Sequence, residues 1–324
     1  MLYRISMATQ TSKRRSRWKK PPILKEDGTK KRRTPTDKDE DIFRLLVPGS
    51  DVRRPWGYSL LRSNYISALL DRYHNSVLGS LDALATDGWL YLPDQPINNF
   101  RHLVYALSEK GAKHVDQPRP RHIHLYRHEL MCCDIAASFE LAARAHGATI
   151  FSWPAIISSD QFPRATREAR NPMAIPVGNR SIRADWEPFI FKTHKSFFLP
   201  GFEADTGTEP LDSTDRTRSS IRQKFEDYLA IIHKKTHLTH FGAHSFFVPF
   251  IVMRDEQRLI DMMKLLERVI VAEKYPRQYA RRFGFKLIPG FYEKPVAPTD
   301  WVAEGWKRAG YGDFSFVERE EDAA

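Results

Sequence analysis

Cysteine is scarce in this sequence: its 324 residues contain two, the neighbouring Cys132 and Cys133. Adjacent cysteines rarely pair, so the chain is not a disulfide-stapled secreted domain, and a cytoplasmic location is expected. No apolar run is long enough to cross a bilayer, which indicates that the protein does not span a membrane. Neither a G-x-S-x-G elbow nor a phosphate-binding loop occurs, so we expect no serine hydrolase of that type and no use of ATP.

Positive charge, by contrast, is abundant. Lys and Arg number 51 against 40 Asp and Glu, which gives a formal net charge of +11. Residues 1–40 hold 13 basic and 5 acidic residues and almost nothing apolar to bury, which predicts a disordered basic tail. Arg14 and Arg15 lie in a basic run of this tail, where we expect contacts with DNA phosphates. The alternative is a tail that only keeps the protein in solution.

The segment 41–116 has the pattern of a winged helix-turn-helix domain. Helix patterns are followed by strand patterns: helices at 41–46, 63–70 and 75–84, then strands at 89–92 and 102–107. Three helices followed by a hairpin are the order of such a domain, whose recognition helix docks into the major groove of double-stranded DNA.

The expected DNA contacts of this segment are polar rather than cationic, because it holds 8 basic and 8 acidic residues. Asn addresses adenine edges, and Arg addresses guanine edges or a narrow minor groove. The expected contacts are Asn75, Ser76 and Ser80 on the third helix, and Asn98, Asn99 and Arg101 at the wing. For Asn75 and Ser76 the alternative is capping of the helix.

A second domain follows a linker at 117–127, and together the two domains predict a protein of α/β (α+β) class. Over 128–290 the patterns follow the order helix, three strands, helix, strand, which is the αβββαβ order of a restriction-endonuclease-like domain. Residues 291–324 are expected to form a C-terminal tail.

Two carboxylates on one strand are the main chemical clue. Glu203 and Asp205 lie two residues apart, so they are expected to point to the same face, beside Asp185 from the preceding apolar segment. Lys224 begins the following helix. Three carboxylates as ligands and a lysine that steadies developing charge suit a hydrolytic Mg²⁺ site. The alternative is an ion-pair network in which Arg183 or Lys224 neutralises Glu203, because a buried carboxylate without a cation is costly.

Four motifs carry a resemblance to a known family: H-E-L-x-x-x-D-x-x-x-x-x-E-L-A-A-R at 128–144, A-D-W at 184–186, F-E-A-D-T-G-T-E-P-L at 202–211 and K-F-E-D-Y at 224–228. They resemble the bacterial replication-relaxation family. The resemblance implies a winged helix joined to a PD-(D/E)xK nuclease-like domain, encoded on a plasmid or another mobile element. It also implies a role in plasmid replication and DNA relaxation.

Carried over by position, the resemblance makes Asp185 the second-strand acid, Glu203 and Asp205 the third-strand pair, and Lys224 the catalytic lysine. All three acids are then the expected Mg²⁺ ligands. The chain departs from the superfamily pattern on its third strand, which offers Glu-x-Asp instead of Glu-x-Lys. The lysine therefore has to come from another element, the helix that carries Lys224.

The leading functional hypothesis is a DNA-binding protein of a mobile element that acts in DNA relaxation or replication as a Mg²⁺-dependent nicking endonuclease. The alternative is a catalytically inactive transcriptional regulator, or an accessory protein of the relaxosome or of replication. Relaxase or replication proteins are the expected protein partners, and a homodimer is left open.

Overall fold

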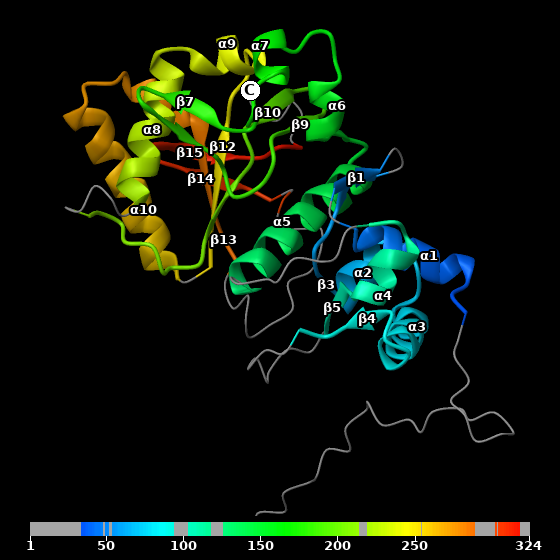
Figure 1. Ribbon diagram of the computed structural model, residues 1–324. Coiled ribbons are helices and arrows are strands. Elements are labelled where there is room, and N and C mark those ends of the chain that lie inside the picture. The colour runs from blue at the N-terminus through cyan, green and yellow to red at the C-terminus, as the bar shows by residue number, and fades with distance from the viewer. Residues whose placement is uncertain are drawn as a thin grey trace, which may run out of the picture.

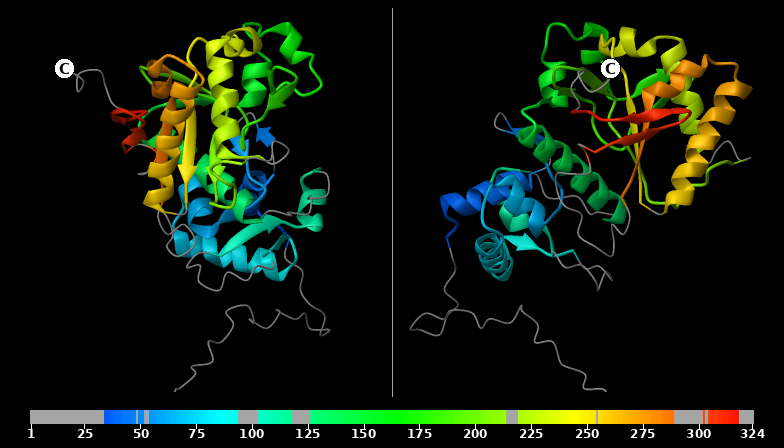
Figure 2. Two further views of the ribbon diagram at one scale, coloured as in Figure 1. Left: turned by 90° about the vertical axis from the view of Figure 1, so that its left-hand side faces the viewer. Right: turned by 180° about the vertical axis from the view of Figure 1, so that it is seen from behind.

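The computed structural model describes residues 34–47, 49–51, 54–93, 103–117, 126–213, 219–253, 255–288, 302 and 304–317. These residues form a mixed α/β protein (Figures 1 and 2). Five of the expected DNA contacts lie outside the described residues: Arg14, Arg15, Asn98, Asn99 and Arg101. Within the described part of the chain, no helix is long and apolar enough to cross a membrane.

Residues 34–117 form an N-terminal unit of short helices around a small sheet. Its elements are α1 Asp37–Leu45, β1 Gly49–Asp51, β2 Arg54–Gly57, β3 Leu61–Arg62, α2 Ser63–Leu69, α3 His74–Thr86, β4 Leu90–Tyr91, β5 Val104–Leu107 and α4 Glu109–His114. Strand β5 lies between β3 and β4 in an antiparallel sheet. The expected helices and strands of this segment are thus present, and β1, β2 and β3 are additional strands that the sequence patterns did not indicate.

Helix α3 forms because its apolar residues recur at helical spacing. Val77, Leu81 and Leu84 are buried on one side of it. Just beyond the helix, Gly88 adopts the left-handed conformation (φ +73°) that favours glycine. The helix therefore packs one apolar face on the N-terminal unit and leaves its other face to solvent.

Residues 126–317 form a larger C-terminal unit. Its elements are α5 Tyr126–Ala145, β6 Thr149–Phe151, α6 Trp153–Ile157, α7 Arg164–Arg167, β7 Ile175–Val177, β8 Arg180–Ile182, β9 Phe189–Lys192, β10 Ser196–Leu199, β11 Glu203–Asp205, α8 Ile221–His233, α9 Thr236–Phe241, β12 Val248–Val252, α10 Glu256–Ala272, the 3-10 helix η1 Arg277–Arg282, β13 Phe283–Leu287, β14 Trp306–Arg308 and β15 Tyr311–Phe314.

The main sheet of this unit has the order β11-β12-β13-β14-β15. Its first three strands run parallel and its last two are antiparallel. The expected C-terminal tail at 291–324 is corrected here, because residues 306–314 add two strands to the sheet. Trp306 and Phe316 are fully buried, so this segment packs into the hydrophobic core and is not a tail.

The two faces of the main sheet pack against different helices. Side chains alternate along β11, so Ala204 joins the apolar cluster around α5, whereas Glu203 and Asp205 point to the opposite face. That opposite face is covered by α8 and α10, whose buried apolar residues pack on Phe250 and Val252 of β12. Glu203 and Asp205 are therefore held between the sheet and these two helices.

A glycine bends the chain between the second sheet, of order β10-β9-β6, and the main sheet. Strand β10 ends at Leu199, and Gly201 follows with φ +116°. A Cβ at this position would lie 2.1 Å from the backbone oxygen of Trp186, so glycine is required. The Phe247 amide donates to the Phe198 carbonyl at 3.1 Å, so β10 and the start of β12 remain linked across the bend. The acid strand β11 thus follows this bend and pairs with β12 in the main sheet.

Helix α5 belongs to the core of both units, which share one continuous apolar cluster. Polar contacts cross the same junction. Arg62 at the start of α2 donates to Asp134 of α5 at 2.6 Å, and both side chains are 3% exposed. Tyr58 donates to Glu140 at 2.7 Å. Although a linker sequence separates them, the two units therefore pack as one body and are not tethered domains.

Candidate functional site

Glu203 is buried between β11 and α8, where two donors from α8 hold it. Lys224 Nζ lies 2.8 Å from Glu203 Oε2, and the Tyr228 hydroxyl donates to Oε1 at 2.5 Å. Lys224 and Tyr228 are four residues apart, so they share one face of the helix. Both oxygens of Glu203 therefore have a donor from the protein, and the side chain is 2% exposed.

Asp185 lies beside Glu203, but it is not on a strand. It occupies a bend between β8 and β9, which corrects its expected position as a second-strand acid. Its amide donates to the Phe202 carbonyl at 3.1 Å, and its Oδ2 accepts from the Ala204 amide at 2.8 Å. Lys224 Nζ is 4.0 Å from this oxygen, and His128 Nε2 of α5 is 3.3 Å from it. The bend thus brings Asp185 to the lysine.

Asp205 faces the same side of the sheet as Glu203 but has a different partner. Arg258, in the first turn of α10, donates to its two oxygens at 2.5 and 2.7 Å. The same guanidinium donates to the Glu209 carbonyl at 2.6 Å. This is a bidentate charged pair, buried on both sides. The expected convergence of Asp205 with Lys224 is therefore not found, because α10 supplies its own cation.

Sequence reasoning did not assign roles to Arg258, His128, Tyr228 or Glu209. The carboxylate of Glu209 is 3.1 Å from Lys224 Nζ, so the lysine has three acidic neighbours. Two local signals were available: the last acid of the E-A-D-T-G-T-E string and the four-residue spacing from Lys224 to Tyr228. Arg258 comes from a distant part of the chain and gave no local signal. His128 begins the H-E-L motif at 128–144, but nothing in that motif pointed to Asp185.

Burial and ion pairing push the pKa values of this cluster in different directions. Burial raises the pKa of Glu203 from its ordinary 4.5 to about 7, although Lys224 opposes the shift. Burial also acts on Asp185, but the hydrogen bond from His128 and the charge of Lys224 outweigh it and lower the pKa of that carboxyl. For Lys224, the charges of Glu203, Asp185 and Glu209 outweigh burial, so its pKa is raised and it stays charged.

The raised pKa of Glu203 predicts how stability depends on pH. Between pH 4.5 and about 7 the folded protein binds the Glu203 proton more tightly than the unfolded chain does, so this residue makes stability fall as pH rises. Glu203→Gln removes that titration, and its free energy of unfolding should decline less across the same window. The measurement is urea denaturation at several pH values for both proteins.

Tyr228→Phe is the matched control for this prediction. It removes a donor to the charged form of Glu203, so the decline should move to higher pH. Equal pH profiles for wild type and Glu203→Gln would contradict the burial of an ionisable carboxyl at this position.

The donor set does not fit the expected Mg²⁺ site. Magnesium needs open carboxylate oxygens in near-octahedral geometry. Here both oxygens of Glu203 bind Tyr228 and Lys224, and both oxygens of Asp205 bind Arg258. Across the described ranges, no three His, Cys, Asp or Glu side chains are grouped so that they can hold a metal ion. Cations of the protein therefore occupy the positions that a metal ion would need.

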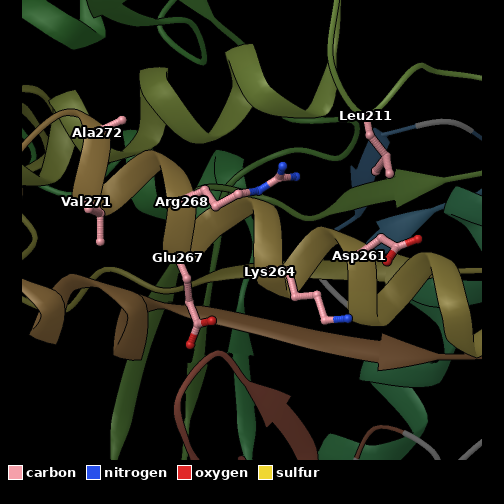
Figure 3. A pocket seen from close by; sticks show the side chains of 7 residues that line it. All are labelled: Leu211, Asp261, Lys264, Glu267, Arg268, Val271 and Ala272. Atoms are coloured by element: carbon pink, nitrogen blue, oxygen red, sulfur yellow. The ribbon is translucent and has the colours of Figure 1, made fainter.

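Two hollows lie near these elements. A cavity of about 220 Å³ opens beside Asp185, between Trp56 and Glu129. A shallow groove of about 770 Å³ lies on the outer face of α10, where acidic and basic side chains alternate (Figure 3). The groove is lined by Leu211, Asp261, Lys264, Glu267, Arg268, Val271 and Ala272, and none of the expected site residues reaches it.

The expected contacts on α3 are only partly available to a ligand. Asn75 and Ser76 are exposed, and Ser80 is half-buried. Neither Asn75 nor Ser76 is the N-cap, which is Tyr73. Asn75 Nδ2 donates to the Tyr73 hydroxyl at 3.3 Å, and that tyrosine is 75% exposed. The start of α3 therefore presents amide, hydroxyl and aromatic groups to solvent.

Comparison with known proteins provides no relative for this chain. No known protein family, no curated protein and no solved structure matches it.

Proposed function

We propose that this protein binds double-stranded DNA through a winged helix and keeps a nuclease-like unit that does not cleave DNA. The proposal that this unit does not cleave DNA rests on the bonding partners of its acidic side chains. Glu203 and Asp205 each have both oxygens bound by side chains of the protein itself. A regulator or accessory protein of DNA relaxation or replication, the alternative in the sequence reasoning, fits this geometry best.

The winged-helix proposal rests on the order of elements in the N-terminal unit. Helix α1 precedes β3, then come α2 and α3, and β4 and β5 pair as a hairpin. In a winged helix the third helix is the one that enters the major groove. Asn75 and Ser76 are exposed at the start of α3, where such a helix meets base edges.

The nuclease-like proposal rests on the neighbourhood of Lys224. Asp185 and Glu203 come from adjacent segments, which are linked by a backbone hydrogen bond and by the bond from the Ala204 amide to Asp185. Both acids meet the same lysine. From α5 to β12 the chain runs helix, strands, helix, strand, if the short helices α6, α7 and α9 and the β7–β8 pair are set aside. It departs from the expected αβββαβ order by the additional strand β11, and β6, β9 and β10 form a sheet separate from that of β11 and β12. The mobile-element origin and the partnership with relaxase or replication proteins rest on the motif resemblance.

A nonhydrolytic role follows from the energetics of this cluster. A Mg²⁺ ion at Glu203 would have to displace Lys224 or Tyr228 from a carboxylate that is 2% exposed. Lys224 is also held at this place by Asp185 and Glu209, so its charge would stay near and repel the incoming ion. The Glu203–Lys224 pair is therefore unfavourable for binding a metal ion, and it holds β11 against α8.

The second candidate is the Mg²⁺-dependent nicking endonuclease. The observation in its favour is that Asp185, Glu203 and Lys224 lie together, since two acids and a lysine are the groups that phosphodiester hydrolysis uses. The cavity beside Asp185 gives this acid an opening to solvent.

One experiment separates the two candidates. The purified protein is incubated with supercoiled plasmid, with and without Mg²⁺ or Mn²⁺, while its melting temperature is followed under the same conditions. We expect the plasmid to be bound, as a gel shift reports, and to stay supercoiled. We also expect no metal-dependent rise in melting temperature, because a ligand stabilises only a native state that binds it.

Metal-dependent nicking that Lys224→Ala and Asp185→Asn both abolish would favour the endonuclease. Failure to shift any duplex at low salt would reject DNA binding itself.

A further inference from the structure

Exposed cations gather where α8 and α10 end, beside η1. We call this surface the basic cap: Lys234, Lys235, Lys274, Arg277, Arg281 and Arg282, all of them exposed. The segment 273–282 contains one carboxylate, Glu273, against four of these cations. The cap is therefore one of the strongest concentrations of positive charge in the described part of the chain.

Aromatic contacts hold the parts of the basic cap together. The ring of His233, the last residue of α8, lies 5.2 Å from that of Tyr275 and 6.2 Å from that of Tyr279. Arg281 stacks over Tyr311, with its guanidinium carbon 4.5 Å from the ring centre. The ends of the two helices and η1 therefore form one surface with tyrosines among its cations.

Two cations of the cap, Lys235 and Arg282, lie near His237 of α9. Burial lowers the pKa of His237, and the charges of Arg282, His244 and Lys235 lower it further. In the part of the chain that the structure describes, Lys234, Lys235, Lys274, Arg281 and Arg282 form no side-chain ion pair. These charges are thus available to an anionic partner.

Two lysines of the cap adopt a conformation that favours glycine. Lys235 and Lys274 both have φ of +56°, each at the end of a helix. The left-handed conformation costs a residue with a Cβ roughly 1–2 kcal/mol. A lysine near a helix C-terminus regains about 0.3–1 kcal/mol from the helix dipole. That gain offsets only part of the cost at each position.

We propose that the basic cap binds backbone phosphates of DNA, as a second contact besides the winged helix. The inference rests on the proposed DNA-binding function and extends it to the far end of the C-terminal unit, since α3 lies at the opposite end of the molecule (Figure 1). Clustered Lys and Arg neutralise phosphates without reading sequence. The contact should therefore add affinity for every duplex alike and be weakened by salt.

The test compares salt slopes of full-length variants by fluorescence anisotropy on two duplexes: one that the wild-type protein selects from a random pool, called the cognate duplex, and one of random sequence. The variant Lys235→Asn/Lys274→Asn removes two charges, and Asn tolerates the left-handed conformation. We expect the slope of log affinity against log salt to become shallower by about 2, roughly 1 per lysine, equally on both duplexes. Its melting temperature should stay equal or rise, because the strained lysines are gone.

Two control variants make this result specific. Lys192→Asn/Lys195→Asn removes the same two charges from the β9–β10 hairpin and should keep the wild-type slope. Asn75→Ala should narrow the difference between cognate and random duplex and leave the slope unchanged. Lys235→Gly/Lys274→Gly repeats the test with the residue best suited to the backbone.

Wild-type protein that binds DNA with a salt slope equal to that of both cap variants would overturn this inference and leave the winged-helix proposal standing. Wild-type protein that binds no duplex would reject the proposed function first. A further experiment measures binding of the protein to vesicles that contain phosphatidylserine. Binding to them that the cap variants lose, with DNA binding unchanged, would assign the cap to a membrane surface and overturn the phosphate contact with DNA.

Discussion

Arg258→Ala is expected to destabilise the protein by about 3–5 kcal/mol. Arg258 is 8% exposed, and it donates to both carboxylate oxygens of the buried Asp205. Without the guanidinium, Asp205 stays buried, and among the described residues the Gly207 amide, at 3.2 Å, is the one remaining donor to its side chain. The carbonyl of Glu209 loses its bond to the same side chain. Urea denaturation of wild type and variant measures the difference.

Two further variants identify the cause of this loss. Arg258→Lys keeps the charge but not the planar fork, so it should recover only part of the stability. Asp205→Asn/Arg258→Met removes both charges and should be far less harmful than Arg258→Ala alone, since a buried pair contributes little net stability. A loss below 1 kcal/mol in Arg258→Ala would mean that solvent reaches Asp205.

Arg62→Ala should cost a similar amount, about 3–5 kcal/mol, at the junction between the two units. Arg62 and Asp134 are both 3% exposed, and the residues come from different units. Burial raises the pKa of Asp134 from 3.8 to about 6, although Arg62 opposes the shift. Without Arg62 the carboxyl should become still harder to ionise. The deficit should therefore shrink as pH falls toward 6 and level off below about 6, where Asp134 is protonated in both folded proteins.

Denaturation of Arg62→Ala at pH 5 and pH 8 tests this dependence on pH. Arg62→Met/Asp134→Leu is the matched control, because it removes both charges of this pair and leaves neither partner unpaired. This double variant should unfold with about the stability of wild type at both pH values. A deficit in Arg62→Ala that is equal at pH 5 and pH 8 would contradict an unpaired carboxylate as its cause.

Local patterns were enough to predict much of the secondary structure. Val77, Leu81 and Leu84 recur at helical spacing, and α3 buries all three. Strand alternation likewise predicted that Glu203 and Asp205 share a face, because side-chain direction along a strand is a property of neighbouring residues. The segment 306–314 was missed, since its two short strands exist by pairing with each other and with β13.

By itself, the sequence determined which face of β11 carries the acids and which face of α8 carries Lys224 and Tyr228. Only the tertiary structure decided which cation each acid meets. Arg258 reaches Asp205 across 53 residues of chain, and Arg62 reaches Asp134 across 72. Strand alternation says nothing about which helix will cover a strand, because helix packing depends on apolar surfaces distributed over the whole chain. The spacing of Glu203 and Asp205 suggested a metal site. Because α8 and α10 both pack on this face, Glu203 instead pairs with Lys224 and Asp205 with Arg258.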